Sequence, residues 1–158
     1  MDPLASTDIS LLKHKKILIT GASGFIGSNL VKRLSDAGAM VYGTSRTERS
    51  SENPNFRWVR LSLEDYEMSR LVFREIRPDI VYHLSGTVTG STDISLVQQT
   101  YHSLVTSTVN LLTIATELNC ERIVLIGSCR EPAHHGEHAT SPYAMAKWAA
   151  GAYGNMFW

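Results

Sequence analysis

Short apolar runs alternate along this chain with longer amphipathic segments. The apolar runs have strand-like composition and lie near residues 16–20, 40–44, 56–61, 79–84 and 122–126. Apolar residues recur at helical spacing near 24–37, 63–76, 93–118 and 142–155. Strands that alternate with helices form a parallel sheet covered by helices on both faces. The pattern therefore predicts one α/β domain with a doubly wound parallel sheet, which binds ligands at the carboxyl ends of its strands.

Two of the predicted helices carry local start signals. Ser62 and Asp65 have the spacing of a capping box, with acidic residues in the first turn, which predicts a helix start there. Ser141 is a good N-cap, and Pro142 suits the first turn of the last helix. In that helix Tyr143 and Lys147 are four residues apart, so we expect their side chains on one face.

A glycine-rich turn joins the first predicted strand to the first helix. Gly21, Gly24 and Gly27 form a G-x-x-G-x-x-G pattern after Ile17-Leu-Ile-Thr20. Glycine lets a diphosphate approach the backbone, and the helix N-terminus that follows favours an anion. We expect a nucleotide cofactor to contact Gly21, Ser23, Gly24, Phe25, Ile26 and Gly27. The alternative is a structural strand–helix turn without a ligand.

Three residues in the second half of the chain predict proton-transfer chemistry. A cation such as Lys147 beside the Tyr143 phenol favours the phenolate, which makes Tyr143 a candidate general acid/base. Ser128 follows the apolar run Ile123–Ile126, where its hydroxyl can hold a substrate oxygen. The alternative for an isolated Y-x-x-x-K pattern is a solvated helix face.

The end of the second predicted strand bears on the choice of cofactor. An NAD site usually places a carboxylate about 20 residues past the glycine turn, whereas an arginine suits the 2′-phosphate of NADP. Here the strand ends in Ser45-Arg46, with Arg49 nearby. We therefore expect NADP(H), with Arg46 on the phosphate. NAD stays the alternative, because Arg46 can also stack on adenine or face water, and Glu48 can swing in.

These motifs resemble the extended short-chain dehydrogenases/reductases, specifically the NAD-dependent epimerase/dehydratase family with its Rossmann-like fold. The resemblance runs from about Lys15 to Trp158 and includes His83-Leu-Ser-Gly86, which matches a strand-four segment. It implies hydride exchange between a substrate carbon and a nicotinamide, with Ser128, Tyr143 and Lys147 as the catalytic residues. It also implies substrates such as nucleoside-diphosphate sugars. The further cofactor contacts that it implies are Ser62, Leu63, Leu84, Ser85, Gly86, Tyr143 and Lys147.

Three positions depart from the family pattern. Leu104 stands where the family often has Asn, and Ser62 stands where an adenine-side Asp is usual. Sugar dehydratases of the family carry an acidic residue two places after the catalytic Ser or Thr. Here that place holds Arg130, and Glu131 comes one position late. The departure favours an epimerase or reductase over a dehydratase.

Composition excludes several classes of partner. Fifteen basic and fifteen acidic residues leave no net charge, so nothing indicates binding to nucleic acid or to a membrane surface. We see no signal peptide, and two cysteines are too few for a disulfide framework, so we expect a cytoplasmic protein. We also expect no metal site, because the following candidate ligands lie in a loop with no helix to fix them: His134, His135, Glu137 and His138.

Length sets the expected domain organisation. At 158 residues the chain has room for one core, which we place at 15–158 after a flexible lead-in at 1–14. Members of the family usually continue into a C-terminal substrate lobe, so we expect a truncated domain. Two functions therefore stay open: an NAD(P)-dependent enzyme, or an NAD(P)-binding module without turnover of its own. The resemblance also implies a homodimer through the helices near 93–118 and 142–155.

Overall fold

The computed structural model describes residues 9–132 and 137–157 and has at its centre a five-stranded parallel sheet in the order β3-β2-β1-β4-β5. The strands are β1 (Lys16–Thr20), β2 (Met40–Ser45), β3 (Phe56–Arg60), β4 (Ile80–His83) and β5 (Arg122–Leu125). In the register, Ile17 of β1 lies opposite Val41 of β2 and Ile80 of β4. The chain crosses from β3 to β4 over the middle of the sheet, so the strand order reverses between β1 and β4. This reversal is where doubly wound sheets open a crevice for ligands.

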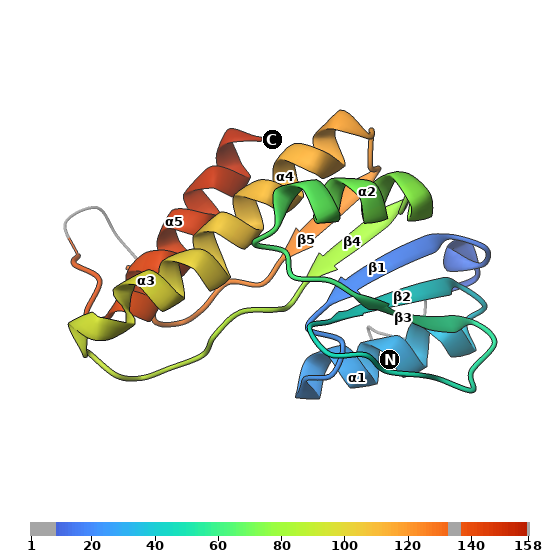
Figure 1. Cartoon of the computed structure of the whole chain (residues 1–158), viewed down its shortest axis with the longest axis horizontal. Coiled ribbons are helices and arrows are strands. Elements are labelled where there is room, and N and C mark those ends of the chain that lie inside the picture. The colour runs from blue at the N-terminus through green and yellow to red at the C-terminus, as the bar shows by residue number, and fades with distance from the viewer. Residues whose placement is uncertain (1–8, 133–136, 158) are drawn as a thin grey trace, which may run out of the picture.

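Helices cover both faces of the sheet (Figure 1). Helix α1 (Phe25–Asp36) lies on one face, and α2 (Tyr66–Ile76) and α4 (Ser107–Glu117) lie on the other. Helix α5 (Pro142–Met156) packs beside α4 and beside the helical segments that precede α4. The predicted α/β class and the doubly wound parallel sheet are confirmed.

Two apolar clusters fill the space between the sheet and its helices. Side chains alternate between the faces of a strand, so Ile17 and Ile19 point to one cluster and Leu18 to the other. The first cluster contains Val31 and Leu34 of α1, and it also includes Val41, Ala39 and Phe56. The second combines α2 and α4 and includes Phe73, Ile76, Val81, Leu111 and Ile114. Burial on both faces explains why these strands are continuous apolar runs.

The start of α2 corrects one expectation. The helix begins at Tyr66, and its N-cap is Asp65, whose carboxylate accepts a 3.0 Å hydrogen bond from the Met68 amide. Ser62 therefore does not cap this helix. Asp65 is the better cap here because its carboxylate is negatively charged, which the neutral Ser62 hydroxyl is not, and this charge complements the free amides of the first turn. The segment from Leu61 to Glu64 thereby stays outside the helix and lies along the ligand crevice.

The long fourth helix is one helical path with a change of winding in the middle. It runs through η2 (Ile94–Leu96), α3 (Val97–Thr100), η3 (Tyr101–Thr106) and α4. The segment η3 is a π-helix, which the sequence pattern did not predict. π-Helical turns are rare and occur mostly at functional sites. Here the wider turn lies beside the crevice, where it places Ser103 at the wall.

The N-terminal lead-in is partly structured. Ile9–Leu12 forms a 3-10 turn, η1, and Leu12 packs against the first apolar cluster. Ordered contacts therefore begin before the expected boundary at residue 15, because an apolar side chain there has a core surface to cover. Residues 1–8 of the expected lead-in and Trp158 lie outside the described residues.

Candidate active site

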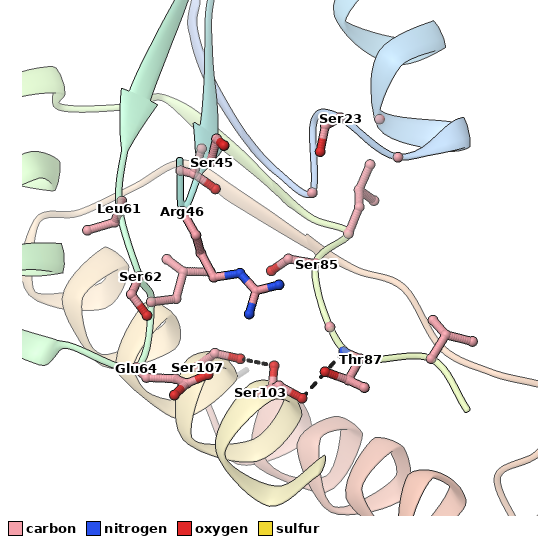
Figure 2. A pocket seen from close by; sticks show the side chains of 18 of the residues that line it. Ser23, Ser45, Arg46, Leu61, Ser62, Glu64, Ser85, Thr87, Ser103 and Ser107 are labelled. Atoms are coloured by element: carbon pink, nitrogen blue, oxygen red, sulfur yellow. Dashed lines mark hydrogen bonds between the residues drawn. The ribbon is translucent and has the colours of Figure 1, made fainter. Parts of the chain in front are cut away.

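A cavity of about 960 Å³ opens at the carboxyl ends of the strands (Figure 2). The glycine turn after β1, the end of β2, the segment after β3, the loop after β4 and the π-helical turn all contribute to its wall. Twelve residues for which the sequence predicted cofactor contacts line this one cavity: Gly21, Ser23, Gly24, Phe25, Ile26, Gly27, Arg46, Ser62, Leu63, Leu84, Ser85 and Gly86. They come from four separate parts of the chain, and the sheet brings them together.

The glycine turn is built so that only glycine fits at two of its positions. Gly21 has φ +68°, and a Cβ there would lie 2.8 Å from the Leu84 carbonyl carbon. A Cβ on Gly27 would lie 2.8 Å from the Cα of Ala22, which is too close for any side chain. Gly27 therefore lets α1 pack tightly on the turn, and Gly24 is the N-cap of α1 without a side-chain acceptor. The amide groups at this helix start stay available to an anion in the cavity.

The end of β2 supplies positive charge to the cavity. Arg46 extends into it from the strand end (Figure 2). Arg49 also lines the cavity; its Nε donates to Ser45 Oγ at 3.2 Å, and its guanidinium lies 5.2 Å from the Trp58 ring centroid. Among the described residues of the lining, Glu64 carries the one carboxylate, and it belongs to the segment after β3. The β2 end therefore presents two cations to a ligand and no acid.

Several residues of the lining were not predicted from the sequence. Ser103 and Ser107 stand on the long helix; Ser107 Oγ donates to the Ser103 carbonyl at 2.7 Å, and Ser103 Oγ accepts from the Thr87 amide at 3.3 Å (Figure 2). The other missed members of the lining are Thr44, Ser45, Thr47, Arg49, Leu61, Glu64, Thr87, Val88, Gln99 and Ile126. The residues at strand ends could have been predicted to line the cavity, because they neighbour the predicted contacts in the sequence. Ser103 could not, because its position depends on the π-helical turn.

His83 at the end of β4 anchors the loop that forms one wall. Its ring is buried, with Nδ1 2.8 Å from Thr20 Oγ1 and Nε2 3.0 Å from Thr108 Oγ1. Thr20 Oγ1 already accepts from the amides of Leu84 and Ser85, so its own proton goes to Nδ1. Thr108 donates to a backbone carbonyl, so Nε2–H donates to Thr108. The network thus holds a neutral imidazole and orients Leu84 and Ser85 toward the cavity.

The pKa of His83 agrees with this arrangement. Burial, with a smaller contribution from the positive charge of Lys147, lowers the pKa of His83 from 6.5 to about 4. The same hydrogen bonds therefore satisfy the buried His83 ring and position the loop that shapes the cavity.

The last helix starts as the sequence predicted. Ser141 is the N-cap, its hydroxyl accepts from the Ala144 amide at 3.2 Å, and Pro142 occupies the first turn. Tyr143 is buried with Leu104 and Val105 of the π-helical turn. Leu104, which replaces the Asn common in the family, thus packs against the candidate catalytic tyrosine.

Ser128, Tyr143 and Lys147 do not line the cavity themselves. The ammonium of Lys147 donates to the Ile126 carbonyl, and Ile126 does line the cavity. Ser128 follows two residues later in the same loop. Burial lowers the pKa of Lys147, and the charge of Glu131 opposes that shift. Ser128 and Lys147 therefore adjoin the cavity at the end of β5, and Lys147 reaches it through the Ile126 carbonyl.

The described residues also bear on metal binding and on membrane insertion. Among those residues there is no group of three or more His, Cys, Asp or Glu side chains arranged to hold a metal ion. His134 and His135 of the loop lie outside the described residues. No described helix is both long and apolar enough to cross a membrane.

The parallel sheet, the glycine turn at a helix start and the crevice at the strand reversal define a Rossmann-type domain. Residues 17–154 match the NAD dependent epimerase/dehydratase family. This match covers most of the chain, so the chain belongs to that family, and the resemblance seen in the motifs is confirmed.

The relatives include enzymes that act on nucleotide sugars. A UDP-glucose 4-epimerase of Mycolicibacterium smegmatis is 32% identical over 162 residues, which cover 90% of this chain and 51% of the relative. A dTDP-4-dehydro-6-deoxy-D-allose reductase of a Streptomyces species is 30% identical, over 84% of this chain and 42% of the relative.

A solved structure shows the same fold. The Bordetella bronchiseptica enzyme WbmH in complex with NAD⁺ superposes with a TM-score of 0.76 at 25% identity, over 90% of this chain and 53% of that chain. This chain thus spans about half the length of the curated relatives and solved structures that it matches.

Proposed function

We propose that this chain forms the cofactor-binding and proton-transfer half of an NAD(P)-dependent epimerase or reductase that acts on a nucleoside-diphosphate sugar or a related hydroxyl or carbonyl compound. The observation that carries the proposal is the single cavity that gathers the glycine turn, Arg46 and the loop after β4, with Lys147 bonded to its wall at Ile126. The named relatives, which include a UDP-sugar epimerase and a dTDP-sugar reductase, support the substrate class.

In the proposed mechanism the bound nicotinamide supplies the hydride acceptor and donor. Tyr143 takes the proton of the substrate hydroxyl as a phenolate and returns it in the reverse direction. Lys147 lies one turn further along α5, and its positive charge favours that phenolate. The Ser128 hydroxyl donates a hydrogen bond to the same substrate oxygen and keeps its proton. Twelve residues of the cavity wall and the two α5 residues Tyr143 and Lys147 hold the cofactor.

We propose NADP(H) as the preferred cofactor, with NAD as the alternative. Arg46 and Arg49 both stand at the end of β2, where an adenosine ribose lies in this fold, and no carboxylate of the lining comes from that strand end. A guanidinium binds a phosphate through two parallel hydrogen bonds, which favours the 2′-phosphate. Arg49 is held by Ser45 and Trp58, so Arg46 has the greater freedom to close on a ligand.

Calorimetric titration with NADPH and NADH tests this proposal. We expect Arg46→Ala to weaken NADPH binding by about tenfold or more, the loss typical of a charge-assisted hydrogen bond, and to leave NADH binding within about threefold. Arg57→Ala is the matched control, because Arg57 is an exposed arginine on the neighbouring strand that does not line the cavity. Equal loss for both cofactors would assign Arg46 to adenine instead. Tighter binding of NADH than of NADPH by the unaltered chain would overturn the NADP(H) preference.

A second function is an NAD(P)-binding module without turnover of its own. The share of the relatives that this chain matches favours it: the chain covers 51% of the epimerase and 42% of the reductase. Binding energy from remote parts of a substrate contributes to kcat as well as to KM. Turnover assays of the purified chain with UDP- and dTDP-sugars distinguish the two. Steady turnover that Tyr143→Phe abolishes supports the enzyme, whereas cofactor binding without turnover supports the module.

We also propose that the chain forms a homodimer in the cytoplasm. Large apolar side chains stay exposed on α5 and on the neighbouring helical turns, namely Met145, Trp148, Tyr153, Met156, Val97 and Tyr101. A second copy packed through these helices would cover them. Sedimentation of the unaltered chain and of Trp148→Glu tests the interface, with a shift from dimer to monomer expected.

A further inference from the structure

Glu131 closes the turn that carries Ser128. The Ser128 amide donates to Glu131 Oε1 at 2.6 Å, and the Glu131 amide donates to the Ser128 carbonyl at 3.1 Å. Within the turn, the Arg130 amide donates to Ser128 Oγ at 3.2 Å. The hydroxyl of Ser128 accepts that bond and keeps its own proton for donation elsewhere. Three bonds thus fix the backbone and the hydroxyl of Ser128 together.

The same carboxylate also lies close to α5. A Cβ placed on Gly127 would lie 3.4 Å from Glu131 Oε1, and one placed on Gly151 would lie 3.6 Å from Oε2. The Oε2 oxygen therefore lies near the surface of α5 at Gly151, where the absence of a side chain leaves room for the carboxylate. Gly151 follows Lys147 by four residues, so the carboxylate lies on the face of α5 that carries Lys147.

A negative charge at this place acts on Lys147. Among the residues that the structure describes, the groups that face the Lys147 ammonium are the Ile126 carbonyl and Glu131 from the loop, His83 from β4, and Tyr143 from its own helix. His83 is neutral near pH 7, so Glu131 is the described carboxylate whose negative charge acts on Lys147. It offsets part of the cost of burying the ammonium.

We propose that Glu131 is a positioning residue, whose carboxylate closes the turn that presents the Ser128 hydroxyl and holds that turn against the face of α5 that carries Lys147. The roles of Ser128 and Lys147 in this statement rest on the proposed function. In the sequence, Glu131 lies one position after the place where the dehydratases of the family carry an acidic residue. The structure places it half-buried, with Oε1 accepting from the Ser128 amide and Oε2 near Gly151 of α5, so the carboxylate can orient both the loop and the helix face.

Two substitutions separate the geometry of Glu131 from its charge. Glu131→Gln keeps an oxygen that can accept from the Ser128 amide but removes the charge. Glu131→Ala removes both. Glu121→Gln is the control, since Glu121 is an exposed carboxylate that pairs with Lys15 and precedes β5, whereas the loop with Ser128 follows that strand. Amide hydrogen exchange at Ser128 reports the geometry, and the NMR titration of ¹³C-labelled Lys147 reports the charge.

We expect exchange at the Ser128 amide to accelerate by about tenfold or more in Glu131→Ala, as for loss of a charge-assisted bond, and by less in Glu131→Gln. We expect the titration midpoint of Lys147 to move to lower pH in Glu131→Gln and to stay in place in Glu121→Gln. A residue that merely stabilises the loop would leave Lys147 unmoved. An unchanged Ser128 amide in Glu131→Ala, or an unchanged Lys147 midpoint in Glu131→Gln, would overturn the proposal.

Cofactor titration of the same samples distinguishes failure of the proposed function from failure of this inference. Absence of NADPH and NADH binding to the unaltered chain would refute the proposed function and leave the two NMR comparisons valid. Glu131→Gln also keeps the test open where Glu131→Ala fails to fold, because its Lys147 midpoint by itself refutes or supports the charge role.

Discussion

The buried His83 makes the stability of this domain sensitive to mild acid. Its pKa in the folded chain is about 4, against 6.5 for a solvated imidazole, mainly because burial disfavours the charged ring. The bonds to Thr20 and Thr108 reinforce this, since a protonated ring would aim a second N–H at a hydroxyl that already accepts two amides. The unfolded chain therefore binds a proton near pH 6.5, while the folded chain does not.

The size and sign of the effect follow from linkage. The folded-state pKa is lowered, so the contribution of His83 to stability is fully present above pH 6.5 and is lost as the pH falls toward 4. Between pH 7 and pH 5 the loss from this one group is about 2 kcal/mol. The free energy of unfolding of a domain is typically about 5–15 kcal/mol, so this loss is a substantial part of it.

Urea unfolding at pH 7 and at pH 5 measures the effect. We expect the free energy of unfolding of the unaltered chain to fall by about 2 kcal/mol more than that of His83→Gln, whose amide does not titrate in this range. His102→Gln, which removes an exposed imidazole on the long helix, should keep the full fall. Equal pH dependence in the unaltered chain and His83→Gln, or an NMR titration of the His83 ring near pH 6.5, would refute the reasoning.

Three further predictions concern single side chains. Gly86→Ala should cost about 2 kcal/mol or more in urea unfolding, because Gly86 has φ +151° and a Cβ would collide with Leu104, whereas Gly90→Ala in the same loop has open space and should cost little. Ser141→Ala removes the N-cap of α5 and should cost about 1 kcal/mol, measured the same way; no loss would mean that water replaces the cap. Tyr143→Phe should bind NADPH within about threefold of the unaltered chain, by calorimetry, because Phe keeps the aromatic ring beside the cofactor and loses only the hydroxyl used in proton transfer; a larger loss would mean that the hydroxyl itself contributes to cofactor binding.

Much of the fold was open to prediction because its signals are local. All five strands lie within two residues of their expected bounds at each end, since short apolar runs between polar turns have few other conformations that bury them. The cap at Ser141 and the glycine turn are likewise written in neighbouring residues. The start of α2 was predicted at Ser62 but lies at Tyr66, after the N-cap Asp65. Both Ser62 and Asp65 are good caps, and only the packing of the segment after β3 decides between them.

The sequence by itself determined the fold class, the nucleotide-binding turn and the family, because spacing along the chain specifies strands, helices and tight turns. Only the tertiary structure decided which side chains meet. It bonded His83 to Thr20 and Thr108, wound the long helix as a π-turn at Ser103, and turned Glu131 back onto Ser128 and α5. Those contacts join residues from different strands and helices, and their energies depend on burial and on distances across the fold, which no local pattern encodes.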